Sequence, residues 1–155
     1  MEFSEVHAVI EKIKDTHPSV RQYFDQRKKH KKNDENDKFT NRFISSLHVT
    51  FAHASKMRQA TMLSSFQHLV GVRLQINATA LLYSDHIAAI QVEIPADDAT
   101  PKPMNVFPHI TVWCAKNSEA QESNNLPEMV KNNQAERVVL EQPVQLEGVF
   151  SFWYE

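Results

Sequence analysis

The chain has 155 residues, with 17 Lys or Arg against 19 Asp or Glu and a formal net charge of −2. This length suits one domain, 1–155, and the charge gives no overall basic excess of the kind typical of nucleic-acid-binding proteins. Cys114 is the only cysteine, which excludes an intrachain disulfide. The charged N-terminus is unlike a signal peptide and no apolar run approaches the ~20 residues of a membrane span. We therefore expect a cytoplasmic or nuclear protein with no membrane partner.

Two helices are predicted within 1–26. In the first, apolar residues recur at steps of three and four from Phe3 to Ile13, which places them on one face. The segment HPSV interrupts this pattern, and a second short helix follows. Residues 27–38, RKKHKKNDENDK, contain no apolar side chain, so we expect a solvated charged loop. A basic patch that steers RNA is the alternative for this segment.

The rest of the chain reads as strand, helix, strand, strand, and then the same order again. The expected ranges are a strand at 47–55, a helix at 58–70, strands at 72–83 and 87–94, a loop at 95–105, a strand at 109–115, a helix at 118–132 with a break before Pro127, and strands at 137–140 and 144–153. This order indicates an α+β fold with duplicated units at about 47–94 and 107–154. Such a duplication favours two sheets about an approximate two-fold axis, facing a shared cleft.

Each unit opens with the pattern His-x-Thr, at His48 and Thr50 and again at His109 and Thr111. Side chains two positions apart on a strand point to the same face, so each motif would present one imidazole and one hydroxyl together. One neutral imidazole can take a proton from water while a protonated one donates to a leaving oxygen. Hydroxyls can hydrogen-bond phosphate oxygens. The set predicts metal-independent hydrolysis of a phosphodiester, above all a strained cyclic phosphate; two ordinary strand faces with structural histidines are the alternative.

Secondary candidates surround the two motifs. Trp113 has the strand parity of His109, so it either stacks on a base or ribose or packs in the core. Lys56 follows the first motif and could meet an RNA phosphate. His53 has core-side parity, which favours a structural role over substrate binding.

Two further possibilities concern the histidines and the cysteine. His48, His53 and His109 could be imagined as a zinc site, but they lack the usual ligand spacing and an obvious carboxylate, so no metal is expected. Cys114 lies in an apolar run and is predicted to be a buried thiol.

The segments LHVTFAHASK and FPHITVWCAKN, followed by NNLPEMV and ERVVLEQPVQLEGVFSFW, carry a family resemblance. From about His17 to Trp153 the chain resembles the 2H phosphoesterase superfamily and, within it, the C-terminal cyclic phosphodiesterase domain of plant-type tRNA ligases. The resemblance implies a two-lobed α+β fold, with two antiparallel sheets related by a pseudo-two-fold axis around a central cleft and with helices outside.

The resemblance also implies an activity, which is hydrolysis of RNA 2′,3′-cyclic phosphate ends to a 2′-phosphate and a 3′-hydroxyl during tRNA splicing and RNA repair. His48 and His109 match the catalytic histidines, and Thr50 and Thr111 match the phosphate-binding positions. No cofactor is implied. The expected partners are tRNA exon halves and the ligase and kinase domains of a longer tRNA ligase, from which this chain would be excised unless it stands alone.

Two other functions remain open from the sequence. The first is a phosphodiesterase acting on ADP-ribose 1″,2″-cyclic phosphate or another small cyclic nucleotide. The second is an RNA- or nucleotide-binding module that keeps the cleft without turnover, against which the presence of all four motif residues argues.

Overall fold

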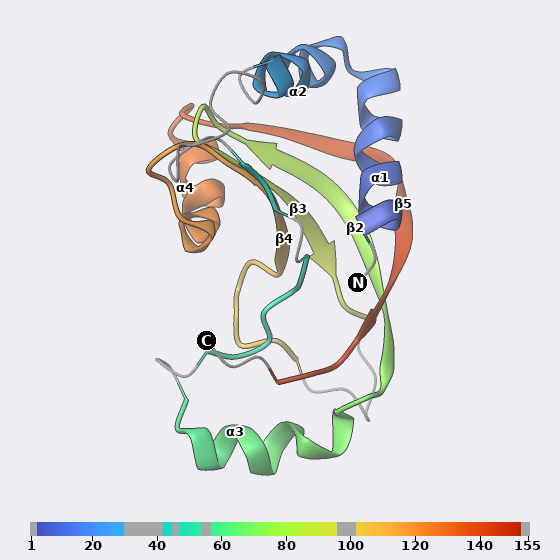
Figure 1. The fold of residues 1–155 in the computed structure, drawn as a ribbon, viewed down its shortest axis with the longest axis vertical. Coiled ribbons are helices and arrows are strands. Elements are labelled where there is room, and N and C mark those ends of the chain that lie inside the picture. The colour runs from blue at the N-terminus through green and yellow to red at the C-terminus, as the bar shows by residue number, and fades with distance from the viewer. Residues whose placement is uncertain (1–2, 30–41, 45–46, 54–56, 96–101, 153–155) are drawn as a thin grey trace.

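The computed structural model describes residues 3–29, 42–44, 47–53, 57–95 and 102–152 (Figure 1). Its elements in chain order are α1 (Phe3–Thr16), α2 (Pro18–Lys29), β1 (Arg42–Phe43), α3 (Gln59–Phe66), the 3-10 helix η2 (Gln67–Leu69), β2 (Arg73–Tyr83), β3 (Ile87–Glu93), β4 (His109–Cys114), the 3-10 helix η3 (Ala120–Asn125), α4 (Leu126–Lys131) and β5 (Glu136–Val149). The strands described form one antiparallel sheet in the order β1-β4-β3-β2-β5. The chain therefore has the predicted α+β class.

The N-terminal helices form as their apolar pattern predicts. In α1 the stripe that includes Val6, Val9 and Ile13 is buried against the sheet. Pro18 opens α2, where the missing N–H of proline leaves no hydrogen bond unmade. Because α2 continues to Lys29, the first three residues of the predicted charged loop are helical, and the rest of that loop lies outside the described residues.

Two irregularities shape the sheet. In β2 the register with both neighbours shifts between Ala78 and Ala80. Thr79 is an extra residue relative to β3, whereas on the other side residues 140–143 of β5 lie opposite it. In the β3–β4 ladder Ala88 pairs with Trp113 and Ala89 with Thr111, so Val112 is the extra residue. A bulge of this kind reverses the alternation of side chains between the two faces of a strand.

The predicted break at 141–143 is wrong, because the last two expected strands form one continuous β5. Ala78 pairs with Val144 and Ala80 with Val139, so Pro143 lies in the stretch where the ladder is interrupted. β5 is also an edge strand, and a residue without an N–H is tolerated at both kinds of position.

The strand predicted at 47–55 is also wrong over its described part. Residues 47–53 contain no strand; they run irregularly to a bend at Phe51, and the Phe51 carbonyl accepts a hydrogen bond from the N–H of Met104 at 2.7 Å. Leu47 is buried while His48 is exposed. The alternation of apolar and polar residues in this segment thus reflects burial of one side of the chain. A segment can bury one side without pairing with a neighbouring strand.

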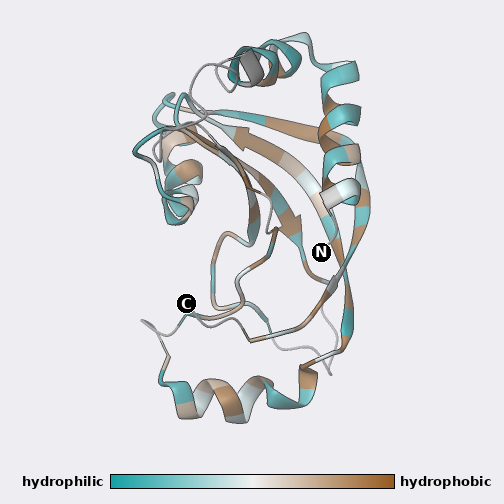
Figure 2. Cartoon of the chain, viewed as in Figure 1, coloured by the Kyte–Doolittle hydropathy of each residue, from teal (hydrophilic) through white to brown (hydrophobic). Residues whose placement is uncertain are grey.

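Helices cover both faces of the sheet. The cluster beneath α1 and α2 takes Ala88, Ile90 and Val92 from β3, whereas the cluster beneath η3 and α4 takes Ile87 and Ala89 from the same strand. The central strands are accordingly the most continuously apolar part of the chain, and the helices show mixed hydropathy (Figure 2). We call these two surfaces the α1/α2 face and the α4 face.

A third, smaller cluster lies at the other end of the molecule, between α3 and the end of β5 (Figure 1). It contains Phe66, Leu69 and Phe150, with Phe51 packed against them. The expected second sheet, related to the first by a two-fold axis, is not confirmed, since the described strands belong to a single sheet. No described helix has an apolar stretch long enough to cross a membrane.

Candidate active site

The second His-x-Thr motif lies on β4, at the start of the strand. His109 pairs with Gln91 of β3 and Thr111 pairs with Ala89, before the bulge at Val112. Paired residues in an antiparallel ladder project to the same face, and Ala89 belongs to the cluster under α4. The imidazole and the hydroxyl therefore project together to the α4 face, as the parity of the motif predicts.

His109 is held by the residue two positions before it. Its Nδ1 lies 2.7 Å from the carbonyl oxygen of Phe107, and the two rings stack with centroids 4.9 Å apart. A carbonyl oxygen only accepts hydrogen bonds, so Nδ1 carries the proton. In the neutral imidazole, Nε2 is then the nitrogen with the available lone pair. Burial is the largest influence on the pKa of His109 and lowers it, while the Phe107 carbonyl partly opposes this.

His48 lies close enough to act on His109 electrostatically. The side chain of His48 is exposed, and its positive charge is a further cause that lowers the pKa of His109. The two motif histidines therefore lie within electrostatic range of each other, although only one of them is on a strand. Their environments differ, because His109 is partly buried against an aromatic ring and His48 is open to water.

Thr111 has a buried partner that the sequence did not single out. Its Oγ1 lies 2.8 Å from Oγ of Ser123 and 3.4 Å from the carbonyl oxygen of Ala120, both in η3. Ser123 is fully buried. A serine in a polar stretch, AQESNN, has no periodicity that marks it as buried, so only the packing of η3 against β4 identifies it.

The remaining candidates belong to the first motif or follow it. Thr50 is half-buried in the irregular segment 47–53. The side chain of His53 is exposed, so its parity with core residues does not bury it; its carbonyl accepts a hydrogen bond from Met57 N–H at 3.2 Å. Lys56 lies outside the described residues.

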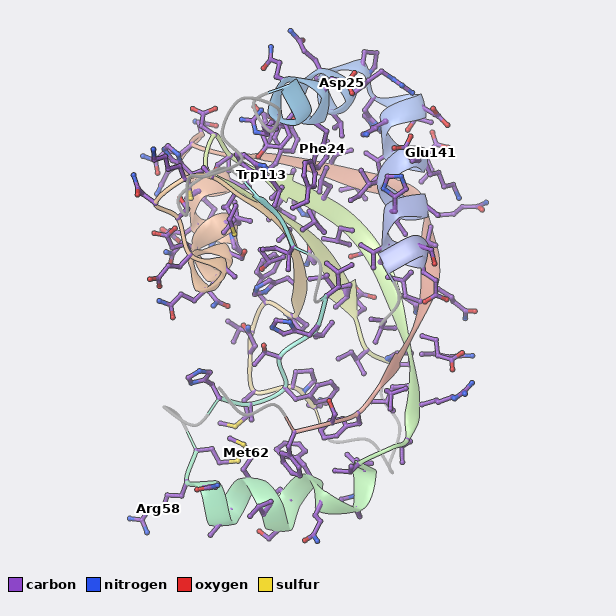
Figure 3. The ribbon with its side chains drawn as sticks, in the orientation of Figure 1. Phe24, Asp25, Arg58, Met62, Trp113 and Glu141 are labelled. Atoms are coloured by element: carbon purple, nitrogen blue, oxygen red, sulfur yellow. The ribbon has the colours of Figure 1, made fainter. Side chains whose placement is uncertain are left out.

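Trp113 does not share the face of His109, because the bulge at Val112 turns it to the other side. It is 2% exposed and packs in the cluster under α1 and α2, which is the core alternative for this residue. Its ring meets Tyr23 edge-on at 5.7 Å, and the Arg27 guanidinium lies over it at 4.7 Å. Figure 3 shows Trp113 at the α2 end of the sheet, with Phe24 nearby.

The same bulge affects Cys114. The thiol is fully buried, as predicted, but it packs in the cluster under α4 and not with Ile110 and Val112. In the described part of the chain, no group of three or more His, Cys, Asp and Glu side chains is arranged to hold a metal ion. The three histidines considered above therefore do not gather into a zinc site there.

The arrangement can perform proton transfer next to an anion. A half-buried imidazole with a fixed tautomer can accept a proton, an exposed imidazole close to it can donate one, and a hydroxyl two residues from the first can hydrogen-bond an oxyanion. These are the requirements for opening a phosphodiester by in-line attack of water.

Comparison with known proteins identifies the family. A sequence model described as the fungal tRNA ligase phosphodiesterase domain matches residues 2–151. The chain is similar to tRNA ligase 1 of Arabidopsis thaliana, with 30% identity over 151 residues, which is 97% of this chain and 13% of that protein. The chain thus spans only a small part of the length of this relative. Because the family match covers nearly all of the described elements, the chain belongs to the family of tRNA ligase phosphodiesterase domains.

Proposed function

We propose that this chain hydrolyses the 2′,3′-cyclic phosphate at RNA ends, leaving a 2′-phosphate and a 3′-hydroxyl. The observation that carries the proposal is the environment of His109. Its Nδ1–H is committed to the Phe107 carbonyl, and burial together with the nearby charge of His48 lowers its pKa. An imidazole kept neutral, with Nε2 available, is suited to act as a general base.

In the proposed reaction one imidazole acts on the attacking water and the other on the leaving oxygen. Nε2 of His109 takes a proton from water as the water oxygen attacks phosphorus. The bond from phosphorus to O3′ breaks, and protonated His48 donates its proton to O3′. Thr111 and Thr50 donate hydrogen bonds to the non-bridging oxygens, where charge builds up. Solvent returns both histidines to their starting states. Because both proton transfers come from imidazoles, the mechanism requires no metal.

The proposal places the chain in the 2H phosphoesterase type, with two lobes about a cleft. One feature of the sheet supports this. The ladder is interrupted at Thr79 on both sides of β2, which divides the sheet into an upper part that carries β4 and a lower part in which residues 73–78 pair only with 144–149 and the end of β3. The segment 47–53, with the first motif, packs partly on the lower part through Phe51.

The biological role is inferred from the family. The relative is a tRNA ligase, of which this chain spans 13%. We infer that the domain heals RNA ends during tRNA splicing, in the nucleus or cytoplasm, on tRNA exon halves and alongside ligase and kinase domains of a longer protein.

The test is an end-product assay in the presence of a chelator. An RNA oligonucleotide ending in a 2′,3′-cyclic phosphate is incubated with the chain, and the position of the terminal phosphate is read by phosphorus NMR. A 2′-phosphate is expected. A 3′-phosphate would contradict the bond assignment, hydrolysis of only small nucleotides such as ADP-ribose 1″,2″-cyclic phosphate would contradict the substrate, and tight binding without turnover would contradict the activity.

A further inference from the structure

A positively charged side chain lies beside the proposed site, on a strand that carries neither motif. Arg137 is on β5, and its side chain is exposed. Its Nε and Nη2 both donate to Oε1 of Gln91, at 3.3 and 3.2 Å. The two residues are 46 positions apart in the sequence, so this is a long-range contact made by the fold.

The register places this pair on the face of the catalytic residues. Arg137 pairs with Leu82, whose side chain packs under α4, so the guanidinium projects to the α4 face. Gln91 pairs with Ala80 on one side and with His109 on the other. Side chains of directly opposed residues lie about 4.5–5.5 Å apart at Cβ. The order across the face is therefore Arg137, then Gln91, then His109.

A small residue on β2 allows the Arg137 side chain to reach Gln91 on β3. The side chain must cross β2, and the residue of β2 on this face beside Gln91 is Ala80, which is only a methyl group. A larger side chain there would fill the path. The hydrogen bonds to Gln91 orient the guanidinium group of Arg137 from one side. The side chain therefore loses little further conformational entropy when a ligand binds.

The partner of this guanidinium is neutral. Gln91 supplies one amide oxygen, and among the described residues no carboxylate lies within ion-pairing distance of Arg137. By contrast, Arg21 and Arg73 each pair with a carboxylate, at 2.7 and 3.2 Å. A positioned guanidinium with unused donors and full charge fits an anion, with phosphate geometry preferred.

Gln91 also lines a depression in the surface, next to Pro108 and hence close in sequence to His109. The depression, of about 440 Å³, opens between the end of β3 and the segment before β4, and its charged lining residues are Glu93 and Lys102. This volume lies in the range of small-ligand sites. A nucleoside whose cyclic phosphate meets His109 carries its other phosphate at the 5′ position, which is the anion next in reach.

We propose that Arg137, oriented by Gln91, binds the phosphate on the 5′ side of the terminal nucleoside. The inference rests on the proposed function, because it takes His109 as the position of the cyclic phosphate. It makes the site selective for RNA ends and 5′-phosphorylated nucleotides over nucleosides that carry only the cyclic phosphate. It also gives a chain of net charge −2 a local cation for its polyanionic substrate.

The test compares three substrates in the wild type and in Arg137→Gln. They are a nucleoside 2′,3′-cyclic phosphate, its 5′-phosphorylated form, and a dinucleotide that ends in a cyclic phosphate. We expect Arg137→Gln to raise KM for the second and third by about 10- to 100-fold, as for a lost charged hydrogen bond, and to leave the first unchanged. Arg137→Lys keeps the positive charge but lacks the planar guanidinium group, and its KM values are expected to lie between those of the wild type and Arg137→Gln. Arg21→Gln removes the same charge from α2, on the opposite face, and is the matched control.

Each other result overturns the inference. Equal loss on all three substrates would place Arg137 at the cyclic phosphate itself, and no loss on any would remove it from the site. Loss with both arginine variants alike would make the effect a general charge effect. If the wild type turns over none of the substrates, the proposed function fails separately. Dissociation constants of the same three ligands, measured by calorimetry, then decide whether Arg137 still binds the 5′-phosphate.

Discussion

The two His-x-Thr motifs have the same sequence pattern but different supports. The second lies on β4, paired with β3, where the Phe107 carbonyl fixes the tautomer of His109 and η3 holds Thr111. The first lies in an irregular segment with His48 exposed. Burial lowers the pKa of His109, which suits a base, whereas the exposed His48 can exchange its proton with water. Under the proposed function, this asymmetry favours His109 as the base and His48 as the acid.

The largest effects are expected from the histidines themselves. His109→Ala and His48→Ala should each lower kcat by about 10²–10⁴-fold on an RNA cyclic phosphate, because each removes one proton transfer. The two variants separate on a substrate with sulfur in place of the 3′-bridging oxygen, since a thiolate leaves without a proton. On that substrate His48→Ala should regain most of its activity and His109→Ala should not. Steady-state kinetics on both substrates measure this.

The control for this pair is the overall fold. Circular dichroism of both variants should match the wild type, because the His48 side chain is exposed and that of His109 is only partly buried. Recovery of His109→Ala in place of His48→Ala would reverse the assignment of base and acid. Recovery of neither would show that the leaving oxygen needs no proton from this pair.

The threonines should show the next largest effect and the same asymmetry. Thr111→Val and Thr50→Val each replace a hydroxyl by a methyl group of similar size, and each should lower kcat/KM by about 10- to 100-fold through a lost hydrogen bond to a charged oxygen. Thr111→Val also leaves buried Ser123 without its partner, so it alone should lower the free energy of unfolding, by about 1–3 kcal/mol. Urea denaturation measures the second quantity, and equal stability of the two variants would contradict the buried pair.

Ser123→Ala should have a smaller effect on catalysis. Thr111 Oγ1 lies 2.8 Å from Oγ of Ser123 and donates a longer hydrogen bond, at 3.4 Å, to the carbonyl oxygen of Ala120. Without the Ser123 hydroxyl, Ala120 is the one remaining partner of Thr111 among the described residues, so this carbonyl holds the threonine proton more firmly and a phosphate oxygen receives it less readily. We expect a several-fold loss of kcat/KM, in the range of about 1 kcal/mol for one neutral hydrogen bond. Ser123→Thr retains a hydroxyl and should recover activity if it folds. A loss of stability with unchanged kcat/KM would restrict Ser123 to a structural role.

The sequence predicted which residues of the second motif share a face, but not the irregularities of the strands around them. Parity correctly put His109 and Thr111 on one face, and periodicity located α1 and the central strands β2 and β3. Neither could reveal the bulge at Val112, because a bulge depends on the ladder between two strands and leaves no local signal. That one residue moved Trp113 to the α1/α2 face and Cys114 to the α4 face.

Contacts between residues far apart in the sequence could not be predicted from the sequence either. The alternation of Leu47 and His48 indicated one-sided burial, but whether such a segment joins a ladder depends on its neighbours in space. Pro143 was taken to end a strand, yet the β2–β5 ladder is interrupted where it stands. Ser123 and Arg137 meet their partners only through tertiary packing, and neither belongs to a motif.

The smallest effect tests the electrostatic link between the motifs. The positive charge of His48 disfavours protonation of His109 and so lowers the pKa of His109, in addition to the larger influence of burial. In the wild type the base is therefore neutral at neutral pH, and the acid limb of kcat/KM should lie below pH ~6.5, the ordinary value for histidine. His48→Gln removes the charge, so the pKa of His109 should rise while burial still keeps it below that value. Proton NMR titration of the His109 ring measures the shift in the inactive variant, with His53→Gln as the control. An unchanged pKa in His48→Gln would mean that the two histidines do not share one site.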